Sequence, residues 1–260
     1  MLTISGTGEM ADYSEADQWS WYEVRDQIVS IVIKNGVENI GNNAFYSFSN
    51  LTSVDISDSV ISIDSGAFEY CSSLEEIDIP SSMCYIADDA FLGCTSLKAI
   101  NVEEGTINYS SKDGVLFSGS KTLIYCPGAG RQEYIIPEGT LDIGEYAFSD
   151  CSDLTSVEIP NSVTEIGSYA FAGCSSLKEI VIPSRVISIG QGAFNNCGGL
   201  KTITFEGLAP EFTEKVFDGV AADVYYPADD ASWTEEVRQD CGGTLTWISV
   251  RLVPEQSLRG

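Results

Sequence analysis

Residues 155–177 read TSVEIPNSVTEIGSYAFAGCSSL, and residues 178–200 read KEIVIPSRVISIGQGAFNNCGGL. Both segments have 23 residues, and nine of their positions are identical. All nine are apolar residues, Gly, Pro or Cys, the residue types that build cores and turns. A tandem repeat with a period of about 20 to 50 residues is typical of a solenoid, a propeller or an array of stacked units.

Two short motifs recur along most of the chain. The first, L-x-x-I-x-I, begins at residues 28, 51, 74, 97, 154, 177 and 200. Its last two apolar positions alternate with other residues, which predicts a short strand with one buried face. The second, V-x-x-I-G-x-x-A-F, ends in a phenylalanine column: Phe45, Phe68, Phe91, Phe117, Phe148, Phe171, Phe194 and Phe217. Most of these lie 23 residues apart, so the sequence predicts about eight 23-residue turns.

A cysteine follows most of these phenylalanines by three residues. The cysteine column is Cys71, Cys94, Cys151, Cys174 and Cys197. Other turns carry Phe48, Ser120 or Val220 there, which indicates a packing position rather than a metal site. Equivalent positions on adjacent turns lie roughly 5 Å apart, which is within disulfide range. Because in-register side chains point in parallel, however, the S–S torsion is poorly met, and we expect free, buried thiols.

The charge balance excludes several classes of function. Lys and Arg number 13 against 39 Asp and Glu, a net charge of −26, which argues against nucleic acid and anionic membrane partners. The chain has no histidine, so Ser-His-Asp and Cys-His catalysis and His-ligated metals are excluded. Asp88–Asp89 and Asp229–Asp230 are acidic pairs without a calcium loop. We therefore expect no metal and no cofactor, and no apolar run is long enough to cross a bilayer.

Departures from the 23-residue rhythm divide the chain. We expect an N-terminal cap at 1–27, a repeat array at 28–205 with an irregular insertion at 103–136, a last imperfect repeat and C-terminal cap at 206–250, and a tail or linker at 251–260. In the first cap, Trp19 and Trp21 either cover the open end of the core, which we favour, or form a ligand platform.

The insertion and the C-terminal cap carry two local predictions. We interpret residues 103–136 as a hairpin or loop that projects from one turn, with about ten extra residues around Pro127 and Gly128. Such an insertion either contributes to a binding surface or is tolerated without a function of its own. In the C-terminal cap, Ser232 and Glu235 form a capping box, which predicts a short helix within residues 231–243.

Strand alternation also predicts which side chains face outward. The outward residues are mostly polar, acidic or small, with Val32 and Val181 among them and without aromatics. Four of the carboxylates stand out as candidates: Glu76, Asp78, Glu158 and Glu179. Interfaces concentrate binding energy in Trp, Tyr and Arg, so this face has no evident hot spot. The four carboxylates are candidate binding residues for a basic partner; the alternative is a solvated sheet face.

The L-x-x-I-x-I motif resembles the strand of a leucine-rich repeat, and IPxSVTxIGxxAFxxCxxL resembles the BspA-like class of bacterial surface proteins. The resemblance covers nearly the whole chain. It implies a right-handed leucine-rich-repeat solenoid with short parallel strands, mostly β and irregular structure with little helix, and a cap at each end. It also implies export to the cell surface and adhesion or binding of host proteins. The class carries no catalytic residues to transfer.

Three functions follow, in order of preference. The first is a non-enzymatic, extracellular protein-binding or adhesion module of a bacterial surface or secreted protein, acting as a monomer. The second is a structural spacer that presents another domain. A hydrolase is a remote third, because carboxylates are plentiful but lie in no pocket motif. The N-terminus lacks the basic and apolar parts of a signal peptide, so an exported parent would carry its signal outside this sequence.

Overall fold

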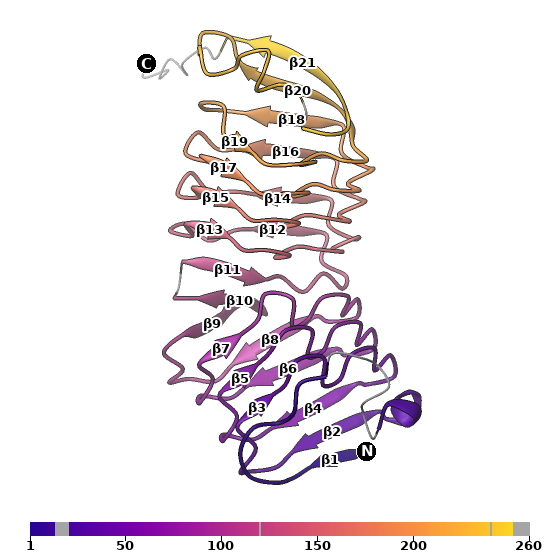
Figure 1. The fold of residues 1–260 in the computed structure, drawn as a ribbon. Helices are drawn as coiled ribbons and strands as arrows, with labels where there is room; N and C mark the ends of the chain where they lie inside the picture. Colours follow the sequence, from indigo (N-terminus) through magenta and orange to yellow (C-terminus); the bar gives the residue numbers. More distant parts are fainter. Residues whose placement is uncertain (14–20, 120, 240, 252–260) are drawn as a thin grey trace.

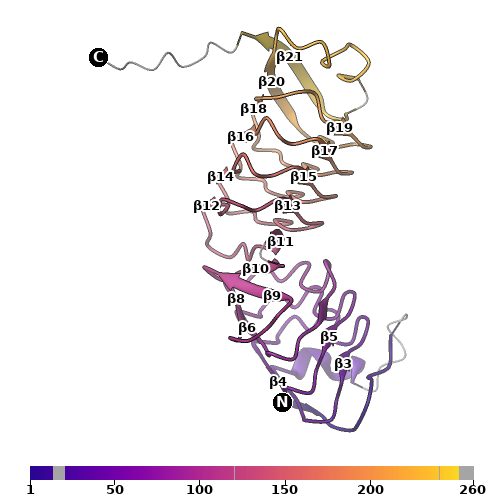
Figure 2. The same ribbon diagram turned by 90° about the vertical axis from the view of Figure 1, so that its left-hand side faces the viewer.

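The computed structural model describes residues 1–13, 21–119, 121–239 and 241–251. The chain winds into a β-solenoid of about ten turns, with a row of longer strands and a row of shorter strands (Figures 1 and 2). The sequence predicted about eight turns. The terminal turns built on the first and last strands lack the phenylalanine motif, so counting by that motif misses them.

The long-strand row runs along the solenoid and is interrupted once, between residues 102 and 133. It contains β1 (Leu2–Ile4), β2 (Ser30–Ile33), β4 (Ser53–Ile56), β6 (Glu76–Ile79), β8 (Ala99–Val102), β12 (Glu133–Ile135), β14 (Ser156–Glu158), β16 (Glu179–Ile182), β18 (Thr202–Phe205), β20 (Ala221–Pro227) and β21 (Thr244–Val250). Paired strands are parallel, and Glu76 pairs with Ala99, which is 23 residues later. One sequence repeat therefore makes one turn.

The short-strand row mostly uses two residues per turn. It contains β3 (Asn39–Ile40), β5 (Ser62–Ile63), β7 (Tyr85–Ile86), β13 (Asp142–Ile143), β15 (Glu165–Ile166), β17 (Ser188–Ile189) and β19 (Glu211–Phe212). Proline makes several of the turns between the two rows: the backbone N–H of Val163 donates to the Pro160 carbonyl at 3.1 Å. Proline thus ends the strand and also closes the following turn, because its carbonyl stays free to accept.

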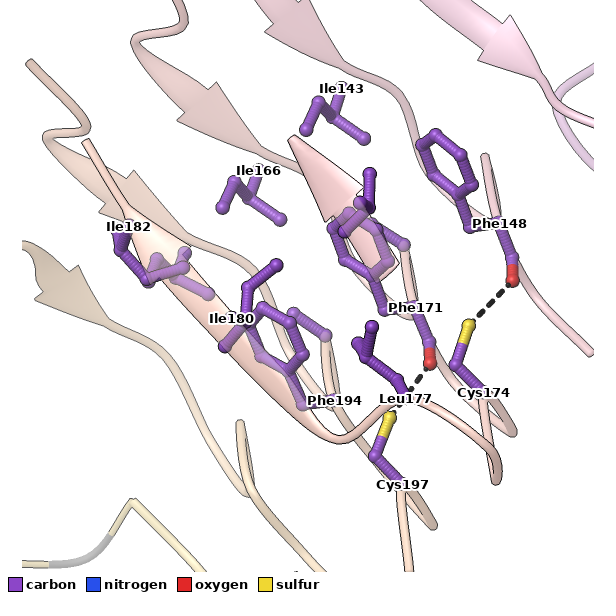
Figure 3. Packing of buried hydrophobic residues seen from close by; sticks show 14 of the residues in the cluster. Ile143, Phe148, Ile166, Phe171, Cys174, Leu177, Ile180, Ile182, Phe194 and Cys197 are labelled. Atoms are coloured by element: carbon purple, nitrogen blue, oxygen red, sulfur yellow. Dashed lines mark hydrogen bonds between the residues drawn. The ribbon is translucent and has the colours of Figure 1, made fainter. Parts of the chain in front are cut away.

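Phenylalanine rings stack along the solenoid axis and form the centre of the core (Figure 3). The ring centroids of Phe148 and Phe171 lie 4.8 Å apart, and those of Phe171 and Phe194 lie 5.2 Å apart. In the first half, Phe45, Phe68 and Phe91 stack in the same way. All of these rings are buried. Each ring therefore contacts the turn before and the turn after, which links neighbouring repeats.

The cysteine column is also buried, and its thiols make a repeated hydrogen bond. The Cys174 Sγ donates to the Phe148 carbonyl at 3.1 Å, and the Cys197 Sγ donates to the Phe171 carbonyl at 3.0 Å (Figure 3). Cys71 and Cys94 donate in the same way to the phenylalanine of the preceding turn. All eight cysteines are free, and every one except Cys84 is buried. Each cysteine of the column thus donates a hydrogen bond to a backbone carbonyl of the preceding turn.

We expect this burial to suppress thiol reactivity. Desolvation raises the pKa of Cys94 to about 12, and only the thiolate reacts with alkylating agents. Iodoacetamide should rapidly modify one cysteine, Cys84, in the native protein and all eight after denaturation, as measured by intact mass. Raising the pH to about 9 should add no further fast adducts. Rapid labelling of Cys174 or Cys197 under native conditions would contradict the buried column.

The insertion is not a projecting loop but a partition inside the solenoid. It contains β9 (Tyr109–Lys112), β10 (Val115–Ser118) and β11 (Thr122–Tyr125), and β10 is antiparallel to both of the others. Val115 packs into the core of the second half, whereas Leu116 packs into the core of the first half, and both are fully buried. The expectation of a projecting hairpin is therefore wrong, because the hairpin covers two cores at once.

The junction also corrects one member of the phenylalanine column. Tyr125, not Phe117, follows Phe91 in the stack, with ring centroids 5.9 Å apart. The Tyr125 hydroxyl donates to the Phe91 carbonyl at 2.9 Å, which satisfies it inside the core. Tyr125 lies 23 residues before Phe148, so the residues after it keep the repeat register. The extra residues lie before Tyr125, in β9 and β10, and not around Pro127 and Gly128.

Aromatic residues cover both ends of the core. At the first end, Trp21 stacks on Phe45 with ring centroids 6.2 Å apart, and its Nε1 donates to the Ala44 carbonyl at 3.2 Å. Trp19 lies outside the described residues. At the other end, Trp233 and Trp247 pack over Phe205. Indole rings suit these positions because they bury a large apolar area and still donate one hydrogen bond.

The predicted helix within residues 231–243 is wrong: its described residues form turns and bends. The described residues contain one helical segment, a 3₁₀ helix at Tyr22–Gln27. The Ser232 hydroxyl, expected to cap a helix, donates to the Asp230 carboxylate at 2.7 Å and accepts from the Ala209 N–H at 2.8 Å. Its side chain thus ties the C-terminal turns to the preceding repeat.

Candidate functional site

The four predicted binding carboxylates are exposed on the outward face of the long-strand row, but they do not form one group. Glu76 and Asp78 lie on β6, before the β9–β10 partition, whereas Glu158 on β14 and Glu179 on β16 lie on successive long strands after it (Figure 1). We call these two parts of the outward face the first-half face (β2 to β8) and the second-half face (β12 to β21).

The first-half face is polar, and some of its side chains interact with neighbouring residues. The Asn101 Nδ2 donates to the Asp78 carboxylate at 2.9 Å. Next to Glu76 in the chain, Glu75 forms an ion pair with Lys98 at 2.7 Å. Asp78 thus has an amide partner on the neighbouring strand, whereas no ion pair in the described residues involves Glu76 or Asp78.

The second-half face carries an apolar ridge, of which the sequence reasoning placed only Val181 on the outward face. The ridge consists of Ile135, Val181, Tyr225 and Ile248, with Glu158 and Thr204 between them at the intervening turns. Between β14 and β16, which are in contact without strand pairing, the 23-residue offset from Glu158 to Val181 continues the ridge. Ile135 is 67% exposed and Val181 is 45% exposed. The strands on which the sequence prediction rested carry no outward aromatic residue, but the face continues onto β20, where Tyr225 faces outward and pairs with Thr204.

An acidic column runs beside the ridge. It consists of Glu133, Glu179 and Asp223, and each lies two residues before a ridge residue on the same strand. Two residues along a strand are roughly 6.6 Å, so each carboxylate lies next to an apolar side chain on the same face. No ion pair in the described part of the chain involves these three residues or Glu158. The second-half face thus combines exposed apolar side chains with carboxylates that lack basic partners.

A hollow of about 560 Å³ opens where the ridge begins. Its lining includes Lys112 and Asp113 from the β9–β10 turn, together with Ile135 and Glu158. Arg131 holds this turn in place, because its Nη2 donates to the Asp113 carbonyl at 2.9 Å while its guanidinium lies 5.2 Å from the Tyr134 ring centre. The partition therefore forms one wall of a depression at the end of the second-half face.

One member of each acidic pair noted in the sequence, Asp89 or Asp230, accepts local hydrogen bonds. Asp89 accepts hydrogen bonds from the Ser65 hydroxyl at 2.7 Å and the Gly66 N–H at 3.2 Å. Asp230 accepts from the Ser232 hydroxyl and N–H, which lowers the pKa of its carboxyl group. Among the residues that the structure describes, no three His, Cys, Asp or Glu side chains gather in a way that could hold a metal ion. Nor does any described helix have the length and apolarity to span a membrane.

Comparison with known structures finds other bacterial repeat proteins. A leucine-rich repeat protein from Eubacterium ventriosum is 27% identical, with a TM-score of 0.64, over 95% of this chain and 80% of that chain. The pneumococcal vaccine antigen PcpA is 24% identical, with a TM-score of 0.62, over 87% and 69% of the two chains. A leucine-rich cell surface protein from Faecalibacterium prausnitzii is 24% identical, with a TM-score of 0.55, over 86% and 61%.

The repeat itself matches a family model. The BspA type leucine-rich repeat region matches in six copies over residues 20–125 and 129–223. The gap between these two matches lies just after β11, where the partition ends. No curated protein matches the chain. Since the family model covers well over half of the sequence and the solved relatives share the solenoid, this chain belongs to the BspA-type leucine-rich repeat family.

Proposed function

We propose that this chain is a non-enzymatic, extracellular protein-binding or adhesion module of a bacterial surface or secreted protein. The observation that carries the proposal is the second-half face, where exposed Ile135 and Val181 lie among carboxylates without basic partners. Apolar contacts supply affinity at such a face, and charge supplies orientation and rate of encounter. The partner is a protein with Lys or Arg around an apolar patch, such as a host extracellular protein.

Several features support a binding role over a catalytic one. The chain belongs to a family of repeat scaffolds, and the carboxylates of the face are exposed on short strands. One solved relative is described as a cell surface protein and another as a vaccine antigen, which supports a surface location. We propose that the module acts as a monomer.

A spacer role is the second candidate, and one observation favours it. The strands β1 and β21 lie at opposite ends of the solenoid (Figure 1), so the stack of turns separates whatever is attached to each end. A spacer needs no binding partner, and this difference separates the two functions experimentally.

The test is binding to a panel of host matrix, mucosal and serum proteins at low and physiological salt. We expect salt-sensitive binding that falls by about tenfold or more in the double variant Glu158→Lys/Glu179→Lys. The matched control, Glu76→Lys/Asp78→Lys, changes the net charge equally on the first-half face and should retain most of the affinity. Equal loss in both variants would indicate net charge alone. Absence of binding to the whole panel would favour the spacer.

A further inference from the structure

The outward face of β12, β16 and β20 repeats one pattern on every second turn. Glu133 and Ile135, Glu179 and Val181, and Asp223 and Tyr225 each place an acid and an apolar side chain two residues apart, both facing outward. The alternate strands β14 and β18 interrupt the ridge with Glu158 and Thr204. The second-half face therefore has a period of two turns that the 23-residue repeat does not require.

We propose that this face binds a basic amphipathic α-helix of the partner, lying along the solenoid axis. The inference rests on the proposed function and specifies its partner. Parallel strands lie about 4.8 Å apart, so Ile135, Val181 and Tyr225 follow one another at roughly 9.6 Å. Positions i and i+7 of an α-helix lie about 10.5 Å apart on one face. A helix with one apolar side chain per heptad therefore matches the spacing of the ridge closely enough to contact Ile135, Val181 and Tyr225 in turn.

An extended segment fits this spacing less well. In a strand, side chains on the same face repeat at about 6.6 to 6.8 Å. This distance differs from the roughly 9.6 Å between ridge residues, so the second side chain already misses its contact. Ile248 lies one turn beyond Tyr225, or roughly 4.8 Å, and a helix reaches it with the residue three or four positions further on. The spacing thus favours a helix over a strand.

The charges of the face specify the polar part of that helix. Glu158 lies between Ile135 and Val181, opposite the helix position three or four residues after the first apolar contact. Glu133, Glu179 and Asp223 flank one side of the ridge, so Lys or Arg on the matching flank of the helix face them. The hollow beside Ile135 leaves room for a large first side chain. A second copy of this chain is a poor occupant, since it carries the same net charge of −26.

The test uses a synthetic helical peptide of about four heptads, with Leu every seventh residue and Lys at the flanking positions. A second peptide has the same composition but an irregular Leu spacing, and a third replaces Lys with Glu. Fluorescence anisotropy at physiological salt measures binding to the whole chain. We expect the patterned peptide to bind at least about tenfold more tightly than the irregular one and the Glu peptide not to bind.

Two protein variants locate the contact. Ile135→Ser/Val181→Ser should weaken the patterned peptide by about tenfold or more, because it removes two exposed apolar contacts without changing charge. The control Val32→Ser removes an outward valine from the first-half face and should have no effect. Both sites are partly or largely exposed, so the variants should keep the wild-type circular dichroism spectrum.

Several results would overturn the helix. Equal affinity for the patterned and irregular peptides would show that binding depends on charge and not on the spacing of apolar side chains. Absence of peptide binding would show that the face does not bind a basic helix. Dimers of the wild-type chain that Ile135→Ser/Val181→Ser abolishes would show that a second copy covers the ridge. If a panel protein still requires Glu158 and Glu179 in any of these cases, the proposed function stands while the helix inference fails.

Discussion

Replacing Phe171 by alanine should lower the free energy of unfolding by about 3–5 kcal/mol. The ring is fully buried and stacked on both sides, at 4.8 Å from Phe148 and 5.2 Å from Phe194 between centroids. The substitution removes a large apolar group from the core and leaves a cavity. The flanking turns cannot move together to fill it, because hydrogen bonds between their strands fix the distance between turns. Urea unfolding followed by circular dichroism measures the difference.

The control for this prediction is Tyr225→Ala, which truncates an aromatic residue on the outward face. Because Tyr225 stays partly in water, its truncation should cost clearly less than that of Phe171. Stability in a repeat array is mostly a sum of each turn and its neighbours, so hydrogen exchange in Phe171→Ala should increase most in the adjacent turns. A loss below about 1 kcal/mol for Phe171→Ala would contradict the central place of the stack.

Aspartate at either of two adjacent positions in β10 should destabilise opposite halves of the protein. Val115→Asp places a charge in the core of the second half, and Leu116→Asp places one in the core of the first half. Each should cost roughly 3 kcal/mol or more, because a buried carboxylate without a partner must either stay charged at high cost or take up a proton. Hydrogen exchange with mass spectrometry should show lost protection in residues 131–224 for the first and 28–108 for the second.

The matched control is Ser110→Asp, which adds the same charge at an exposed position of β9. It should change stability by less than about 0.5 kcal/mol. If Val115→Asp and Leu116→Asp both reduced hydrogen-exchange protection in the same half, β10 would not divide the two cores. If each variant reduced protection throughout the chain, the two halves would unfold as one cooperative unit.

The sequence alone was sufficient for the repeat and its core. A residue such as Phe171 contacts its equivalents one turn before and one turn after, and both contacts lie at the constant offset of 23 residues. The same offset aligned the strands and the cysteine column. Because these interactions repeat, the pattern of a single turn contains them, and counting along the chain recovers them without knowledge of distant segments.

The junction was only partly predictable. Phe91 and Tyr125 are 34 residues apart, so the contact between them breaks the offset. Counting back 23 residues from Phe148 would have identified Tyr125, and the apolar run Val115–Phe117 is a local signal of a strand buried on both faces. The run does not indicate which two cores the strand separates. That burial depends on two cores meeting at one strand, which is a contact between segments far apart in the sequence.

The outward face depended most on tertiary structure. Residue type marked Glu158 and Glu179 as candidates, but Ile135, Tyr225 and Ile248 come from strands where the motif is weak or absent. Only strand register places them in one ridge, and only the partition separates them from Glu76 and Asp78. The sequence by itself determined what each turn buries, because burial repeats at a constant offset. Tertiary structure decided which exposed side chains share a surface, because that depends on how irregular strands pair across the stack.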